Sequence, residues 1–295
     1  MEIKMKIIDA HNHPDWHGHN LDKTLKNMDS FGIEKTWLLN WECHTADYSH
    51  IYSKLTPAGV LGDVNEPIPF SRCLNYKERA PERFILGYCP DPRDPDACNR
   101  LVAAHDIYGA QVCGELKVRM MYDNPDILML FKVAGSLNMP VTLHLQYDHR
   151  KQWDDPRAEW FGGGIDALER VLKACPDTDF LGHAPGFWMH ISNDEHYQER
   201  SYPPERAEVI PGGRIPELLR KYPNLYCDIS AGSGFTALNR DLEFAKTFLT
   251  EFQDRVLYAR DYFDNKHQEL LNSLMLPTSL LEKIYFKNAE RLLAK

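Results

Sequence analysis

Two histidines separated by one residue, His11 and His13, are the first side chains whose spacing indicates chemistry. They follow the apolar pair Ile7 and Ile8 and precede Pro14, which has no N–H for a β-ladder, so they stand at the end of a short strand. Alternate strand residues share a face, with Cα atoms roughly 6.5–7 Å apart, so both imidazoles can reach one ion. The pair alone is equally consistent with two polar residues at a strand end.

Three more polar side chains stand near the ends of apolar runs further along: His144, His183 and Asp261. Taken alone, each is better explained as a hydrogen-bonded core residue than as a ligand. Burying four imidazoles and a carboxylate together would be costly, whereas a divalent cation binds their lone pairs and offsets the lost hydration. Such ligands suit Zn²⁺ first, with Mn²⁺ and Fe²⁺ as alternatives. We therefore expect a divalent cation at His11, His13, His144, His183 and Asp261.

The charge balance excludes some classes of partner. The 295 residues include 43 Asp and Glu against 34 Lys and Arg, a formal net charge of −9, without a basic run that could follow phosphates. Nucleic acid and anionic membranes are therefore poor partners. The first apolar segment is a short strand rather than a signal sequence, and no apolar run reaches the roughly 18 residues that span a bilayer. We expect a soluble, cytoplasmic protein that acts on a small molecule.

The seven cysteines favour reduced thiols over disulfides. Their number is odd, they are scattered along the chain, and no two form a Cys-x-x-Cys pair. We expect small, buried, apolar side chains and no thiolate zinc site.

Apolar, β-rich runs alternate with helical patterns through the whole chain. Strands are predicted at 6–13, 35–40, 84–89, 112–118, 141–146, 180–184, 225–230 and 256–261. Helices are predicted at 21–30, 71–79, 96–108, 125–137, 165–174, 213–221, 239–252, 268–274 and 279–293. Eight strand–helix repeats without a linker-like break predict a single α/β domain over 1–295, a closed (β/α)8 TIM barrel.

The connections differ in length on the two sides of this barrel. Segments from helix to strand are short turns, whereas those from strand to helix are long at 41–70, 147–164 and 185–212. Loops of that length usually carry function, and they lie over the C-terminal face, where barrels build active sites. We expect Trp16, Trp41 and Trp188 to line the entrance. The alternative is surface elaboration or a contact between two copies in a homodimer.

These motifs resemble the amidohydrolase superfamily, in particular its amidohydrolase 2 branch, which includes aminocarboxymuconate-semialdehyde decarboxylase-like enzymes. The resemblance runs from the His-x-His segment through His144, His183 and Asp261 to the ending at 283–293. It implies that the metal is held by His11, His13, His144 and Asp261. His183 is then either a ligand or a group that polarises the substrate. The branch usually has Gly-Ser or Gly-Thr before the final aspartate, and Arg260 is a departure that alternates away from the interior.

Two residues on one face of the fourth predicted strand leave the number of ions open. In binuclear members of the superfamily, a glutamate or a carboxylated lysine from this strand bridges two ions, so Glu115 and Lys117 are candidates by resemblance. The favoured alternative for Lys117 is an ion pair with Glu115 or Asp228.

The reaction that we predict is metal-assisted hydrolysis of an ester, lactone or amide. A bound ion lowers the pKa of water, Asp261 takes the proton, and His183 or the ion polarises the attacked carbonyl. Arg119 is a candidate anchor for a substrate carboxylate, and the tryptophans for a flat or sugar-like substrate. The alternatives are metal-dependent decarboxylation of an unsaturated or aromatic acid and, because of Arg260, a barrel that binds ligand without turnover.

Overall fold

Eight short parallel strands form the centre of the computed structural model, which describes residues 5–48, 60, 63–146, 160–194, 196–198 and 200–295. The strands are β1 (Ile8–Asn12), β2 (Lys35–Leu38), β3 (Phe84–Leu86), β4 (Cys113–Leu116), β5 (Val141–His144), β6 (Phe180–His183), β7 (Leu225–Asp228) and β8 (Val256–Leu257). Each lies within a run that the sequence predicted as a strand. Their residues are buried on both faces, which explains continuous apolar runs in place of alternation.

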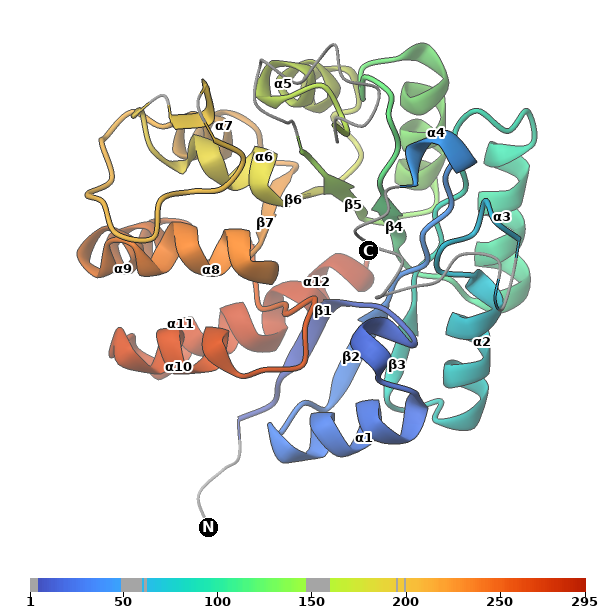
Figure 1. The fold of residues 1–295 in the computed structure, drawn as a ribbon, viewed down its shortest axis with the longest axis horizontal. Helices are drawn as coiled ribbons and strands as arrows, with labels where there is room; N and C mark the ends of the chain where they lie inside the picture. The colour runs from blue at the N-terminus through green and yellow to red at the C-terminus, as the bar shows by residue number, and fades with distance from the viewer. Residues whose placement is uncertain (1–4, 49–59, 61–62, 147–159, 195, 199) are drawn as a thin grey trace.

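Helices alternate with the strands along the chain and pack outside them (Figure 1). They are α1 (Leu21–Ser30), α2 (Phe70–Arg79), α3 (Ala97–Tyr108), α4 (Pro125–Ser136), α5 (Ile165–Ala174), α6 (Pro185–Trp188), α7 (Arg214–Lys221), α8 (Ala231–Asn239), α9 (Leu242–Glu251), α10 (Lys266–Ser273), α11 (Thr278–Glu282) and α12 (Asn288–Leu293). Short turns are η1 (Trp16–Gly18), η2 (Thr45–Asp47), η5 (Met189–Ile191), η6 (His196–Gln198) and the π-helical η7 (Lys283–Lys287). Capping side chains fix where helices begin. For α1, the side chain of Asn20 accepts a hydrogen bond from the N–H of Lys23 at 3.1 Å.

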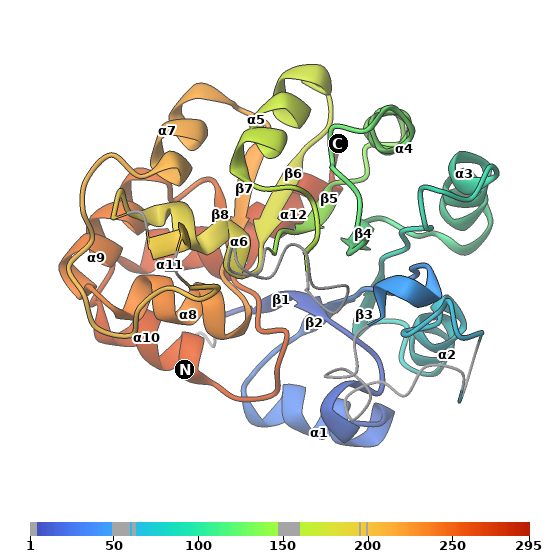
Figure 2. The same cartoon turned by 45° about the horizontal axis from the view of Figure 1, so that its top comes forward.

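The strands close into a barrel at two seams, and Figure 2 shows the ring from a second direction. Pairing is parallel in the order β1–β2–β3 and from β4 to β8. A parallel bridge joins the end of β3 to the start of β4. Between β8 and β1, Ala10 N–H donates to the carbonyl of Tyr258 at 3.0 Å, and Asp261 N–H donates to that of His11 at 2.9 Å. The molecule is therefore the (β/α)8 TIM barrel that the sequence predicted.

Apolar side chains fill the barrel and close one of its ends. The interior cluster contains Ile8, Ala10, Trp37, Leu39, Ile85, Val112, Leu181, Tyr226, Leu257 and Ala259, and it extends to Ala289 and Leu292 of α12. Asn288 at the start of α12 donates to the carbonyl of Val256, the first residue of β8, at 2.7 Å. The helix α12 therefore covers the N-terminal end of the barrel, and the polar site described below lies at the other end.

The predicted asymmetry of the connections is present. The turn from α1 to β2, for example, spans only 31–34, whereas β2 and α2 are separated by 39–69. Trp41 and Ile68 pair as an antiparallel bridge at the base of that long segment. Residues 49–59 and 61–62, and residues 147–159 of the second predicted long loop, lie outside the described part of the chain.

Two helices occur where the sequence analysis predicted loop. Helix α6 occupies the start of the 185–212 segment, and α8 precedes the helix that was predicted to begin at 239. The composition of α8, with two glycines and a serine in its first turn, is typical of a loop. A Cβ atom at Gly234 would clash with the backbone of Ile229, so close packing against the strand-7 segment requires glycine there.

All seven cysteines are free thiols, and Cys98 alone among them is partly exposed. Six of the seven cysteines are therefore buried, as the sequence predicted, and their reduced state stays a prediction. Within the residues that the structure describes, no helix has both the length and the apolar character needed to cross a bilayer.

Candidate metal centre

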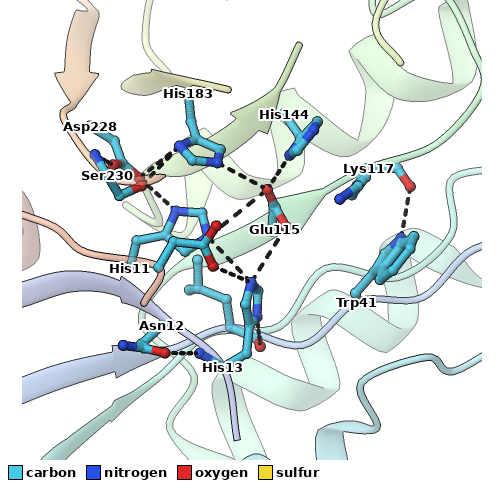
Figure 3. Close-up of polar contacts among 12 residues, drawn as sticks. His11, Asn12, His13, Trp41, Glu115, Lys117, His144, His183, Asp228 and Ser230 are labelled. Atoms are coloured by element: carbon cyan, nitrogen blue, oxygen red, sulfur yellow. Dashed lines mark hydrogen bonds and ion pairs between the residues drawn. The ribbon is translucent and has the colours of Figure 1, made fainter. Parts of the chain in front are cut away.

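The two histidines of β1 converge at the C-terminal end of the barrel (Figure 3). Their Nε2 atoms lie 3.4 Å apart, and both side chains are buried. His13 Nδ1 lies 2.7 Å from the carbonyl oxygen of Leu39, which can only accept, so this nitrogen carries the proton. His11 Nδ1 lies 2.6 Å from a carboxylate oxygen of Asp228 and is a donor for the same reason. The two Nε2 atoms, which are the ring nitrogens left for a metal, thus point toward each other.

The carboxylate of Glu115, near the end of β4, lies in the middle of the histidines (Figure 3). Its Oε2 atom is 3.6 Å from Nε2 of His13. Its Oε1 atom is 3.6 Å from Nε2 of His183 and 3.9 Å from Nε2 of His11, and it accepts a 2.6 Å hydrogen bond from Nδ1 of His144. The two oxygens of one carboxylate therefore face two different sets of imidazoles.

Strand register places His144 and His183 side by side. They are direct partners in the β5–β6 pairing. The second ring nitrogen of His144 lies 2.9 Å from Oε1 of Gln146, and Nδ1 of His183 lies 2.9 Å from the hydroxyl of Ser230. These contacts orient both rings toward Glu115.

Asp228 is a site residue that the sequence analysis considered only as an ion-pair partner of Lys117. It ends β7, is fully buried, and lies 2.6 Å from His11 Nδ1 and 3.7 Å from His183 Nδ1. Its other oxygen accepts the N–H of Ser230 at 2.7 Å. The signal was available, because Asp228 stands at the C-terminal end of a predicted strand, as the four histidines do.

Asp261 approaches the same point from the segment after β8. Its Oδ1 atom lies 3.5 Å from Nε2 of His13, is buried, and has no hydrogen-bond partner among the described residues. Its backbone has φ of 55° and is held by the indole N–H of Trp16, which donates to its carbonyl at 2.6 Å. Asp261 therefore presents an oxygen whose lone pairs a cation would satisfy.

Burial and mutual charge move the pKa values of these groups apart. Burial lowers the pKa of His13 to about 3 and that of His144 to about 4, so both imidazoles are neutral, and Nε2 of His13 can bind a metal. Burial raises the pKa of Asp261 to about 6. Burial also opposes charge on His11, but the carboxylate of Asp228 outweighs it and raises the pKa of His11 to about 10.

The spacing of these atoms fits a divalent cation. Two nitrogens bound tetrahedrally at about 2.1 Å from zinc lie about 3.4 Å apart. The separations of 3.4 Å for His11–His13, 3.5 Å for His13–Asp261 and 3.6 Å for His13–Glu115 match this geometry. Among the described residues, three sets have all their candidate ligand atoms within 4.8 Å of one another: His11, His13 and Glu115; His11, His183 and Asp261; and Glu115, His144 and His183.

Lys117 lies at the edge of this cluster, against aromatic rings. Its ammonium is 4.7 Å from the ring centroid of Trp41 and 5.5 Å from that of Phe161, and the indole N–H of Trp41 donates to its carbonyl at 2.9 Å. Of the two residues proposed for a bridging position, Glu115 is therefore the one that lies between the histidines.

The other candidate substrate-binding residues take different positions. The ring of Trp16 is 5.2 Å from that of His13, at the site itself. Trp188 is fully buried behind the site, where its indole N–H donates to the carbonyl of Asp228 at 3.0 Å, so it supports β7 rather than lining an entrance. The backbone N–H of Arg119 donates to Asp47 at 3.0 Å, which places Arg119 beside η2.

Arg260 points away from the cluster, as strand alternation predicted. Its side chain is buried beside α1, with Nε 2.9 Å from a carboxylate oxygen of Asp9 and Nη1 2.8 Å from Oδ1 of Asn27. The guanidinium therefore leaves the carboxylate of Asp261 free to face the histidines.

Comparison with proteins of solved structure shows the same fold at low identity. A TIM-barrel protein from Bordetella bronchiseptica, described as uncharacterized, is 17% identical, with a TM-score of 0.62 and coverage of 98% of this chain and 99% of that one. A 5-carboxyvanillate decarboxylase from Sphingomonas paucimobilis is 12% identical, with a TM-score of 0.60 and coverage of 98% and 99%. A dihydroxybenzoic acid decarboxylase from a Polaromonas species, with bound manganese and 2-nitroresorcinol, is 14% identical, with a TM-score of 0.60 and coverage of 98% and 96%.

Sequence comparison identifies the family directly. No curated protein matches the chain. The family model described as Amidohydrolase, in contrast, matches residues 8–295, from the first strand to the last residue. This match takes in all the residues of the candidate metal centre, and the chain therefore belongs to the amidohydrolase family.

Proposed function

We propose that this chain hydrolyses a small organic substrate, an ester, lactone or amide, with divalent metal bound around Glu115. The observation that carries the proposal is the position of Glu115, whose Oε2 faces His13 at 3.6 Å while its Oε1 faces His183 at 3.6 Å. One tetrahedral ion needs four ligands, and the four histidines, Glu115 and Asp261 exceed that number. A carboxylate shared by two ligand sets suits a pair of ions that activates water.

At such a centre, some protein groups would transfer protons and others would orient the candidate ligands. Bound metal would supply a water of lowered pKa and would polarise the substrate carbonyl. Asp261, whose Oδ1 has no other partner among the described residues, would accept a proton and pass it to the leaving group. Asp228 and Ser230 would hold the rings of His11 and His183 in place.

Decarboxylation of an aromatic or unsaturated acid is the second candidate. Two of the solved structures of similar fold described above are decarboxylases, and similarity therefore favours this reaction over hydrolysis. Identities of 12–14% establish the fold alone, and the position of Glu115 between two sets of histidines supports hydrolysis as the first candidate. The buried ammonium of Lys117 between Trp41 and Phe161 also suits a flat, carboxylated substrate.

The metal that we propose is a divalent ion of the zinc or manganese type. The imidazole and carboxylate ligands suit both, and manganese is bound in the Polaromonas decarboxylase. Elemental analysis of protein purified without chelators would identify the ion. A content near two ions per chain would support the shared position of Glu115.

One experiment separates the two reactions. The metal-loaded protein is incubated in ¹⁸O-labelled water with a panel of lactones, esters, amides and carboxylated aromatic acids. Hydrolysis incorporates solvent oxygen into the product. Decarboxylation instead releases CO₂ and leaves a solvent proton on the carbon that carried the carboxylate. CO₂ release without labelled product would replace our first candidate by the second. Ligands that raise the melting temperature without turnover would support a barrel that only binds.

A further inference from the structure

A buried ion pair joins the first and last strands directly beneath the candidate ligands. Both Asp9 and Arg260 are fully buried. Arg260 donates its backbone N–H to one carboxylate oxygen of Asp9 and its Nε–H to the other, each at 2.9 Å. Its Nη1 donates to Asn27 of α1 at 2.8 Å. A fourth, longer hydrogen bond runs from Nη1 to the carbonyl of Asp264 at 3.5 Å, and two of the four bonds go to the same carboxylate.

The residues held by this pair are neighbours of the ligands. Asp9 lies two residues before His11 and Arg260 lies directly before Asp261, although the two ligands are 250 positions apart in the chain. The pair adds to the two backbone hydrogen bonds described above at this seam, one of which joins Asp261 N–H to His11. The positions of the β1 and β8 ligands relative to each other therefore depend on this seam.

Asn12 connects the Asp9–Arg260 ion pair to His13, the residue that follows β1. Asn12 donates to Asp9 at 3.3 Å and to the carbonyl of Tyr262 at 3.0 Å, while its Oδ1 accepts the backbone N–H of His13 at 2.9 Å. The pairing of β1 with β2 is irregular between Asp9 and Asn12, although the N–H of Leu39 still donates to the carbonyl of Asn12 at 2.9 Å. The side-chain contacts of Asn12 therefore add to the backbone pairing at this end of β1.

We propose that Arg260 is a positioning residue, which acts through Asp9 to hold His11 and His13 where they can bind the same ion as Asp261. The inference rests on the proposed function only in requiring that the site binds a divalent ion. A side chain that fixes ligand geometry changes metal affinity, whereas one that only stabilises the fold changes the melting temperature. Arginine suits the task because its rigid guanidinium reaches Asp9 through Nε and Asn27 through Nη1, while the backbone N–H of the same residue holds the second oxygen of Asp9.

The test compares R260Q with a matched control, R240Q. Arg240 is equally buried and donates to Asp194 at 2.8 Å, but its partners lie outside the ligand cluster. Both variants should lose thermal stability. We measure Zn²⁺ and Mn²⁺ dissociation constants well below both melting temperatures, and the visible spectrum of the Co²⁺-loaded proteins. R260Q should bind metal roughly tenfold to a hundredfold more weakly and shift the spectrum, and R240Q should do neither.

A thermodynamic cycle tests whether Arg260 acts through Asp9. If it does, D9N/R260Q should bind metal about as weakly as either single variant, because the same contact is lost in all three. Additive losses would overturn the role of Asp9. R260K, which keeps the charge but not the fork, replaces R260Q in these measurements if the latter does not fold, and it should show an intermediate loss.

The outcomes distinguish this inference from the proposed function. R260Q with the metal affinity and Co²⁺ spectrum of the wild type would make Arg260 purely structural and overturn the inference, with the metal site intact. Wild-type protein that binds no divalent ion would overturn the proposed function and this inference with it.

Discussion

Asp228 Oδ2 lies 2.6 Å from Nδ1 of His11, and both side chains are fully buried. This contact determines which ring nitrogen of His11, the first candidate ligand, carries a proton. The carboxylate keeps a proton on Nδ1 and thereby leaves Nε2 for a metal. It also holds the pKa of His11 at about 10, well above the ordinary value of 6.5. Burial alone would raise the pKa of Asp228, but its interactions with His11 and His183 outweigh burial and lower it.

Replacing Asp228 with asparagine should weaken metal binding roughly tenfold to a hundredfold once the affinity is corrected for the protonation of His11, because the ring of His11 loses its charged acceptor. Competition with a chromophoric chelator measures the affinity. The control is D194N, which removes a carboxylate paired with Arg240 outside the ligand cluster. Equal affinities for D228N and the wild type would show that His11 is oriented without Asp228.

Metal binding should release about one proton at neutral pH. His11 is protonated in the metal-free protein because its pKa is about 10, and only its neutral form is a ligand. Apparent affinity should therefore rise about tenfold per pH unit between pH 6.5 and 10. Calorimetric titrations in two buffers with different ionisation enthalpies count the protons. D228N should release fewer, and a wild-type titration without release would contradict the charge state of His11.

The same shift predicts how the metal-free protein responds to pH. The folded-state pKa of His11 exceeds its unfolded value of 6.5, so its stabilising contribution is complete below pH 6.5. That contribution should be lost as the pH rises through about 10. Urea unfolding of metal-free protein across this range checks the prediction. The fall in stability should be smaller in D228N, and an equal fall in both proteins would assign it to other groups.

The double variant H11A/H13A should lose the metal without unfolding the barrel, because two ligands disappear while the apolar interior remains. Metal content and circular dichroism report the two effects separately. The matched control H105A removes a histidine from the outside of α3, where it pairs with Asp106. Full metal content in the double variant would rule out a site at these residues.

Replacing Glu115 with glutamine should lower the metal content from about two ions per chain toward one, because an amide offers one oxygen in place of two equivalent ones. Elemental analysis measures the content. The control E42Q alters another buried glutamate, which pairs with Arg100 at 3.0 Å, outside the ligand cluster. One ion in both the wild type and E115Q would reduce the centre to a mononuclear site.

Periodicity and motif spacing were sufficient to predict the barrel and to single out most of the residues of the candidate metal centre. Strands buried on both faces are continuous apolar runs, and a polar side chain at the end of such a run is costly to bury without a partner or an ion. His11, His13, His144, His183 and Asp261 were found by that rule. Asp228 obeys the same rule but was interpreted as a partner for Lys117, and α8 was missed because its glycines and serine are typical of loops.

Which atoms meet was decided only by the tertiary structure. Sequence spacing placed Glu115 and Lys117 on one face of a strand, but barrel closure put the carboxylate among four imidazoles and the ammonium against Trp41 and Phe161. The Asp9–Arg260 pair joins residues 251 positions apart, a contact that no local pattern encodes. Distances of a few ångströms between distant segments arise from packing and register, whereas the type and order of the elements follow from local side-chain chemistry.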